Sequence, residues 1–174
     1  MEHQDNIAFR HACEKDINRI MLVIQDAKNQ MAREGKHQWT DGYPAVEDIQ
    51  NDISANKGYV MTQDGVVIAY GCITFDGEPA YEELEGKWLS HEPYIVLHRL
   101  AVSDEVKGRG IAKQFFREAE QLAVSKGYRS FKIDTNYDND RMLHIMQKMG
   151  FTYCGIVHYQ KGDRLGFEKL LADS

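Results

Sequence analysis

The chain has 174 residues and a formal net charge of −6 at pH 7. This length predicts one domain over residues 1–174, large enough to bury a hydrophobic core. The acidic balance argues against a general affinity for nucleic acids or anionic membranes, so we expect neither as a partner.

The sequence has no segment that predicts secretion or membrane insertion. Its first residues, Met1–Asn6, are polar and acidic, unlike a signal peptide, and no apolar run approaches the roughly 18 residues that span a bilayer. Cys13, Cys72 and Cys154 are scattered and form no C-x-x-C pair. This pattern favours reduced thiols over a disulfide framework or a zinc site, and we expect a cytoplasmic protein without a metal.

The first part of the chain predicts two helices and three strands. Apolar residues recur every three or four positions in the first helix, and Gly35 is a stop signal for it. Asp64-Gly65 predicts a tight hairpin turn between the second and third strands. In chain order, the expected elements are a strand at Ile7–Arg10, a helix over Glu14–Arg33, a loop at His37–Pro44, a helix over Ala45–Asn56, and strands at Tyr59–Met61 and Val66–Phe75.

The second part alternates strands with helices after a long, acidic and aromatic loop. Its expected elements are the loop Asp76–Pro93, a strand at Tyr94–Val102, a helix over Ile111–Lys126, a strand at Phe131–Asp134, a helix over Asn139–Met149, and strands at Thr152–Tyr159 and Leu165–Leu170. The full order, β-α-α-β-β-β-α-β-α-β-β, predicts an α/β domain. Its mixed central sheet would have about seven strands, flanked by helices.

A glycine-rich turn joins the strand at Tyr94–Val102 to the following helix. We call its residues the glycine loop: Lys107, Gly108, Arg109, Gly110, Ile111 and Ala112. Such a turn offers several unobstructed backbone N–H groups at the positive end of a helix dipole, which suits a pyrophosphate. A plain helix-initiating turn is the alternative. A P-loop nucleotide phosphatase fits poorly, because the Gly-Lys-Ser/Thr ending is absent.

Two motifs resemble the GCN5-related N-acetyltransferase (GNAT) family. The glycine loop matches that family's coenzyme loop, Gln/Arg-x-x-Gly-x-Gly/Ala, except that Lys107 stands first. Asn139 followed by a helix and by Lys148-Met149-Gly150-Phe151 resembles the second motif. Further likeness to a group of bacterial acetyltransferases of unassigned substrate lies in Gln38-Trp39 with Gly42-Tyr43-Pro44, in Leu97–Val102, and in Ile133-Asp134-Thr135 with Asp138-Asn139.

The resemblance implies an N-acetyltransferase that moves an acetyl group from acetyl-CoA to a primary amine of a small molecule or peptide. The glycine loop would bind the coenzyme pyrophosphate. The strand ending in Leu100, Ala101 and Val102 would separate from the next strand and pair with the pantetheine arm, with a backbone N–H near Leu100 or Ala101 facing the thioester oxygen. Asn139 would contact the coenzyme, although an Asn before a helix is often only its N-cap.

Strand alternation places Tyr94, Val96, His98 and Leu100 on one face. His98 precedes the expected thioester position by two residues, and imidazole relays protons at neutral pH, so His98 is the candidate base. A hydrogen-bonded structural histidine is the alternative.

Many family members have a Tyr acid where this chain has Met146, which cannot donate a proton. Tyr137 is the nearest aromatic hydroxyl in the sequence and the substitute candidate; release of the thiolate to water is the alternative.

Aromatic residues of two loops are candidates for the acceptor pocket, because these loops flank the cleft in the family. They are Trp39, Tyr43, Trp88 and Tyr94, with Glu82 as a carboxylate that could attract a cationic amine. The alternative is that they anchor their loops or, for Glu82, face solvent.

Because Met146 cannot act as an acid, a second function stays open: a sensor protein that binds acyl-CoA without catalysis. A homodimer is possible through an exposed strand near the C-terminus.

Overall fold

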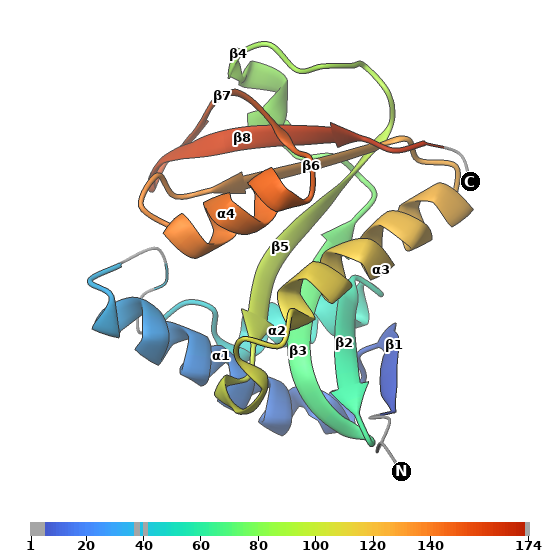
Figure 1. Cartoon of the computed structure of the whole chain (residues 1–174), viewed down its shortest axis with the longest axis vertical. Coiled ribbons are helices and arrows are strands. Elements are labelled where there is room, and N and C mark those ends of the chain that lie inside the picture. Colours follow the sequence, from blue (N-terminus) through green and yellow to red (C-terminus); the bar gives the residue numbers. More distant parts are fainter. Residues whose placement is uncertain (1–5, 37–38, 40–41, 173–174) are drawn as a thin grey trace. The chain divides into compact units, whose positions relative to one another are not determined.

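The computed structural model describes residues 6–36, 39 and 42–172 (Figure 1). Tertiary contacts divide the chain into two compact units. The first unit comprises Met1–Ile73 and Arg99–Phe115, and the second comprises Thr74–His98 and Phe116–Ser174. Each unit is built from two separate stretches of the chain, so residues distant in sequence meet within it. The expectation of a single domain over residues 1–174 stays a prediction.

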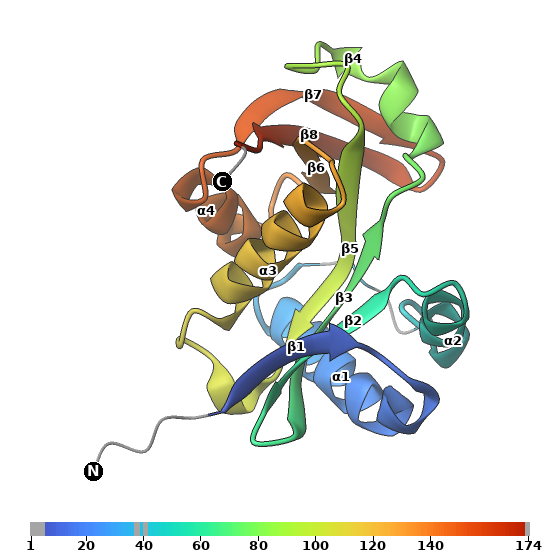
Figure 2. The same cartoon turned by 90° about the vertical axis from the view of Figure 1, so that its right-hand side faces the viewer.

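The first unit packs two helices on an antiparallel set of strands. Both helices, α1 and α2, lie against the strands of this unit (Figure 2). Isoleucines and valines recur at helical spacing on α1, and Ile20, Val23 and Ile24 are fully buried in one core cluster with Val60 and Tyr70. Its elements are β1 (Ile7–His11), α1 (Ile17–Arg33), α2 (Val46–Ser54), β2 (Gly58–Gln63), most of β3 (Val66–Thr74), the second half of β5 (Tyr94–Val102), the short turn Asp104–Val106, and the start of α3 (Ile111–Ser125).

The second unit contains the parallel part of the sheet. The first half of β5 runs parallel to β6, and β6–β8, β8–β7 and β7–β4 are antiparallel pairs. Its further elements are the short turn Pro79–Glu83, β4 (Glu85–Gly86), the rest of α3, β6 (Ser130–Thr135), α4 (Asp140–Lys148), β7 (Thr152–Tyr159) and β8 (Gly162–Leu170).

The predicted mixed α/β sheet is confirmed, with eight strands among the described residues instead of about seven. Their hydrogen-bonded order is β1-β2-β3-β5-β6-β8-β7-β4. The additional strand, β4, lies where the sequence predicted only a loop, because two residues are too few to show an alternating pattern. Gly86 is essential to it: a Cβ there would lie 2.2 Å from the Cys154 carbonyl oxygen. Backbone approach this close excludes any side chain.

All three cysteines are unpaired, as predicted. Cys72 and Cys154 are buried, and burial raises the pKa of the Cys72 thiol to about 12. A thiol that stays protonated is a poor nucleophile, which supports a packing role. In the described part of the chain, no helix combines the length and the apolar character needed to cross a membrane.

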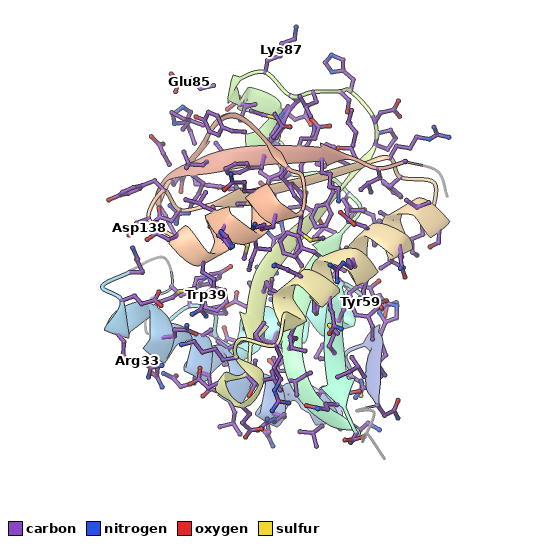
Figure 3. All side chains as sticks on the ribbon, viewed as in Figure 1. Arg33, Trp39, Tyr59, Glu85, Lys87 and Asp138 are labelled. Carbon is purple, nitrogen blue, oxygen red and sulfur yellow. The ribbon has the colours of Figure 1, made fainter. Side chains whose placement is uncertain are left out.

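A histidine clasp holds β4 to the hairpin of β7 and β8. His158 Nδ1 lies 2.6 Å from Asp163 Oδ1, and its Nε2 lies 2.7 Å from Glu85 Oε2. Glu85 and Lys87 lie along this edge of the second unit (Figure 3). The hydrogen bonds with Asp163 and Glu85 raise the pKa of His158. An imidazolium between two carboxylates therefore fastens the edge strand.

Because the pKa of His158 is raised on folding, its stabilising effect is complete below the ordinary histidine pKa of about 6.5 and is lost as pH rises through the folded value. We expect His158→Gln to lower the melting temperature at about pH 6 and to match the wild type at about pH 9. His144→Gln, at an exposed position of α4, is the control and should show no such pH dependence. An equal deficit of His158→Gln at both pH values would contradict the clasp.

Candidate functional site

The glycine loop leaves β5 through a short turn and opens onto α3. Gly108 and Gly110 have φ angles of +83° and +74°, which side-chain-bearing residues rarely adopt, and a Cβ on either would meet nothing within 4 Å. Glycine is therefore required for backbone conformation, not for lack of room. Lys107 and Arg109 beside them are exposed, so their positive charges face solvent.

Polar contacts within the first unit fix the start of the glycine loop. Arg19 on α1 donates from Nε to the Val67 carbonyl (3.0 Å) and from Nη2 to Glu105 Oε2 (3.2 Å). The Asp104 N–H donates to Asp26 Oδ2 at 3.2 Å. These bonds attach the turn before the loop to α1, and Arg19 also attaches it to β3.

The backbone amides at the start of α3 can receive an anion. The first N–H groups of any α-helix lack intrahelical acceptors, and here they belong to Ile111, Ala112 and Lys113. The ladder begins with the Gln114 N–H, which donates to the Gly110 carbonyl at 3.1 Å. Free amides, the helix dipole and nearby cationic side chains together suit a pyrophosphate.

The predicted coenzyme-binding strand leads directly into this loop. Ala101 is buried in the core of the first unit, whereas Leu100 and Val102 are half-buried. The parallel pairing of β5 with β6 is short, running from Tyr94 opposite Ser130 to Val96 opposite Lys132, while β6 continues beside β8 to Thr135. Such a short ladder agrees with strands that separate. The contacts of Leu100, Ala101 and Val102 with the coenzyme stay predictions.

The backbone at Arg99 corrects the predicted alternation of β5. Arg99 has a φ of +56°, in the left-handed region, so the regular alternation from His98 to Leu100 does not hold. A left-handed conformation costs a non-glycine residue about 1–2 kcal/mol. Its guanidinium donates from Nε (2.9 Å) and from Nη2 to the two oxygens of Asp52, and this pairing holds the residue in that conformation.

The two candidate pocket residues of the first unit both have structural contacts. Trp39 packs against the core, and the Tyr43 hydroxyl accepts a hydrogen bond from Arg99 Nη1 at 3.0 Å. Gln38, quoted above with Trp39, lies outside the described residues. Anchoring thus accounts for both aromatic residues, and their contact with an acceptor stays a prediction.

In the second unit, His98 lies beside a carboxylate that was not among the predicted residues. His98 Nε2 is 4.0 Å from Glu78 Oε2, and both side chains are half-buried. The Glu78 N–H donates to the Tyr94 hydroxyl (3.1 Å), which in turn donates to Glu82 Oε1 (3.3 Å). The sequence held one signal for Glu78: it caps the short turn that begins at Pro79.

A second carboxylate of this unit, Asp134 on β6, accepts hydrogen bonds from two tyrosine hydroxyls. Tyr81 and Tyr159 donate to Asp134 Oδ2 at 2.7 and 2.8 Å. Burial, and then the charge of Asp134, raises the pKa of both tyrosines. The phenols therefore remain donors at neutral pH. Nothing in the sequence pattern predicted this cluster, because its members come from three separate segments.

Trp88 and Tyr94, two further candidate pocket residues, enclose a buried lysine. Lys132 is only 4% exposed, and its Nζ lies 4.4 Å from the centre of the Trp88 ring and 4.0 Å from that of Tyr94. Burial lowers the pKa of Lys132. The Trp88 indole also donates to the Tyr81 carbonyl at 2.7 Å. These contacts anchor the segment expected as a loop, and a role in acceptor binding stays a prediction.

A fully buried glutamate attaches the segment predicted as a loop, Asp76–Pro93, to the sheet. Glu168 on β8 accepts from the Leu89 N–H (2.8 Å), the Ser90 hydroxyl (2.6 Å) and the Ser130 hydroxyl (2.8 Å). Three donors compensate the loss of water around a buried carboxylate. The acidic, aromatic segment is thus an ordered part of the second unit.

The remaining predicted residues lie on and before α4. The Asn139 side chain accepts from the Met142 N–H at 3.2 Å and caps the helix, as the alternative interpretation held, while its contact with the coenzyme stays a prediction. Tyr137 is 73% exposed. Met146 is completely buried, so this position supplies packing and no proton. Within the described ranges, no group of three or more His, Cys, Asp or Glu side chains is arranged to hold a metal.

Comparison with known proteins agrees with this geometry. A model of the acetyltransferase (GNAT) family matches residues 23–151. A GNAT-family acetyltransferase from Streptococcus agalactiae is 35% identical, with a TM-score of 0.87, over 95% of this chain and 96% of that one. No curated protein matches significantly.

Two more distant structures share the fold. A GNAT-family acetyltransferase from Listeria monocytogenes is 21% identical, with a TM-score of 0.75, over 95% of each chain. The yncA protein of Salmonella typhimurium, solved with its cofactor acetyl-CoA, is 14% identical, with a TM-score of 0.66, over 97% of this chain and 95% of that one. The family match and the streptococcal relative lead to one conclusion: the chain belongs to the GNAT family of acetyltransferases.

Proposed function

We propose that the protein is an acetyl-CoA-dependent N-acetyltransferase whose acceptor is a primary amine of a small molecule or peptide. Membership of the GNAT family implies acyl-CoA-dependent acetyl transfer. The observation that carries the proposal is the glycine loop, in which two left-handed glycines lead into the open amides of α3. The complex of yncA with acetyl-CoA, on the same fold, supports this choice of donor.

In this proposal, the donor is held mainly through the backbone. The amides of the glycine loop bind the pyrophosphate, and Lys107 and Arg109 add positive charge. Leu100, Ala101 and Val102 pair with the pantetheine arm, and Asn139 contacts the coenzyme in addition to capping α4. A backbone N–H at Leu100 or Ala101 stabilises the negative charge that develops on the thioester oxygen.

Proton transfer is assigned to His98. An amine must lose its proton to attack a thioester, and an imidazole accepts one near neutral pH. Glu78, 4.0 Å away, supports this role because its charge stabilises the imidazolium that results. Tyr137 stays the candidate acid for the departing thiolate, with release to water as the alternative.

The acceptor is proposed to be cationic before it reacts. Glu78, Glu82 and Asp134 give the second unit carboxylates near His98, Tyr94 and Tyr81, and such charges attract an ammonium group. Trp39, Tyr43, Trp88 and Tyr94 are the proposed pocket lining. We further propose a single cytoplasmic domain over residues 1–174 that works without a metal and without nucleic-acid or membrane partners, and that could form a homodimer.

An amine panel separates this enzyme from a sensor that only binds acyl-CoA. Thiol release from acetyl-CoA is followed with aliphatic amines, polyamines and peptides as acceptors. Acceptor-dependent release identifies the enzyme. Binding of acetyl-CoA in calorimetry without such release across the panel would instead identify the sensor.

We expect Gly110→Asp to raise the KM for acetyl-CoA at least about tenfold, because like charges brought together cost several kcal/mol. Gly127→Asp is the matched control. Gly127 also has a positive φ, +85°, and open space around its Cβ position, but it follows the C-terminal end of α3. It should carry the same backbone strain and leave this KM unchanged. An unchanged KM for Gly110→Asp would remove the glycine loop from the mechanism.

We expect His98→Ala to lower kcat by about 10²–10⁴-fold, the usual contribution of a general base, and to flatten the pH profile of kcat. His91→Ala, at an exposed position of the preceding segment, should leave both unchanged. Thermal melting is measured alongside. A large loss of melting temperature with the pH profile intact would show that His98 is structural.

A further inference from the structure

Arg99 combines an unusual backbone conformation with an unusually complete set of side-chain partners. Its φ of +56° lies inside a nine-residue strand, where extended values are the rule. A residue in this region persists only when its surroundings hold it there. Such residues gather at functional sites, so the partners of Arg99 matter.

Three side chains of the first unit form a hydrogen-bond network with the Arg99 guanidinium: Asp52, Tyr70 and Tyr43. Asp52 on α2 accepts from Nε and Nη2, so the pair is bidentate, and Asp52 is only 6% exposed. The Tyr70 hydroxyl donates to the same carboxylate, and the Tyr43 hydroxyl accepts from Nη1 at 3.0 Å. The planar guanidinium is thereby fixed in both position and orientation.

Stability alone does not account for burying these charges. The cost of removing two ions from water roughly cancels their attraction, and apolar side chains of similar volume often stabilise a fold as well. What a bidentate buried pair adds is a defined geometry. The geometry defined here is that of the β5 backbone at Arg99.

The residues after Arg99 are the ones proposed to meet the coenzyme. Leu100, Ala101 and Val102 follow directly, and the Ser103 N–H donates to the Ile68 carbonyl at 2.8 Å before the chain enters the glycine loop. That bond fixes the far end of this short stretch, and the Arg99 side chain fixes the near end. The peptide groups of Leu100 and Ala101 are thus held between two fixed points.

We propose that Arg99 is a positioning residue: Asp52 and Tyr43 hold its guanidinium, and this sets the backbone of Leu100 and Ala101 for the pantetheine arm and thioester of the coenzyme. The inference rests on the proposed function. It also joins the loop of Tyr43, a candidate acceptor residue, to the coenzyme-binding strand. In this proposal, Arg99 acts through the backbone and contacts neither substrate.

Two variants test the proposal, and Arg99→Gly alone serves as the reference for the second. Arg99→Lys keeps the positive charge but loses the bidentate grip. Asp52→Asn combined with Arg99→Gly removes the clamp while leaving no lone buried carboxylate, and glycine accepts the left-handed conformation without strain. The Kd for acetyl-CoA is measured by calorimetry, and stability by thermal melting.

The control comes from a second bidentate Arg–Asp pair, whose arginine is more exposed than Arg99. Arg10 donates from Nη1 and Nη2 to the two oxygens of Asp16 at 2.8 and 3.0 Å, and Asp16 is likewise buried, but this pair lies on β1 and the turn that follows it. Arg10→Lys should cost melting temperature as Arg99→Lys does. It should not change the Kd for acetyl-CoA.

We expect both Arg99 variants to weaken acetyl-CoA binding about tenfold or more, since a strand that is no longer preorganised must be ordered at the expense of binding free energy. The double variant should recover melting temperature relative to Arg99→Gly alone but should not recover affinity. Recovery of both, or an unchanged Kd in Arg99→Lys, would overturn the positioning role. Failure of the wild type to bind acetyl-CoA would instead refute the proposed function on which the inference rests.

Discussion

The two halves of the nine-residue strand β5 contact different parts of the protein. The candidate site depends on the point at which the strand changes its contacts. Its first three residues pair in parallel with β6, within the second unit. Its last four, from Arg99 to Val102, belong to the first unit and lead to the glycine loop. The left-handed backbone at Arg99 stands where the chain passes from one unit to the other. One strand therefore carries both the candidate base, His98, and the start of the proposed coenzyme-binding segment.

Each unit contains a buried carboxylate whose charge is compensated by hydrogen bonds within that unit. Asp52 is paired with Arg99 and bonded to Tyr70, and Glu168 is bonded by three donors. In each case, a carboxylate removed from water is compensated by hydrogen bonds, without which it would be strongly destabilising. Each network also attaches a segment that carries candidate functional residues: the loop of Tyr43 in the first unit, and the segment of Trp88 and Tyr94 in the second.

The proposed donor site and the proposed acceptor site use different kinds of group. Pyrophosphate binding needs backbone amides and a helix dipole, and these follow from two glycines and the start of α3. The proposed amine site depends on carboxylates from separate elements, Glu78 and Asp134. The proposed donor site consists of consecutive residues, whereas the residues of the proposed acceptor site come together only when the chain folds.

The sequence by itself determined the order of the main helices and strands, the mixed sheet, the glycine loop and the family, because each depends on local periodicity or on consecutive residues. Only the tertiary structure decided the surroundings of His98, the contacts of Lys132 with the Trp88 and Tyr94 rings, the two-residue strand β4 and the left-handed backbone conformation of Arg99. Glu78 lies 20 residues before His98, and Asp52 lies 47 before Arg99. Contacts over such separations leave no periodic signal, because they arise only when the strands and helices pack.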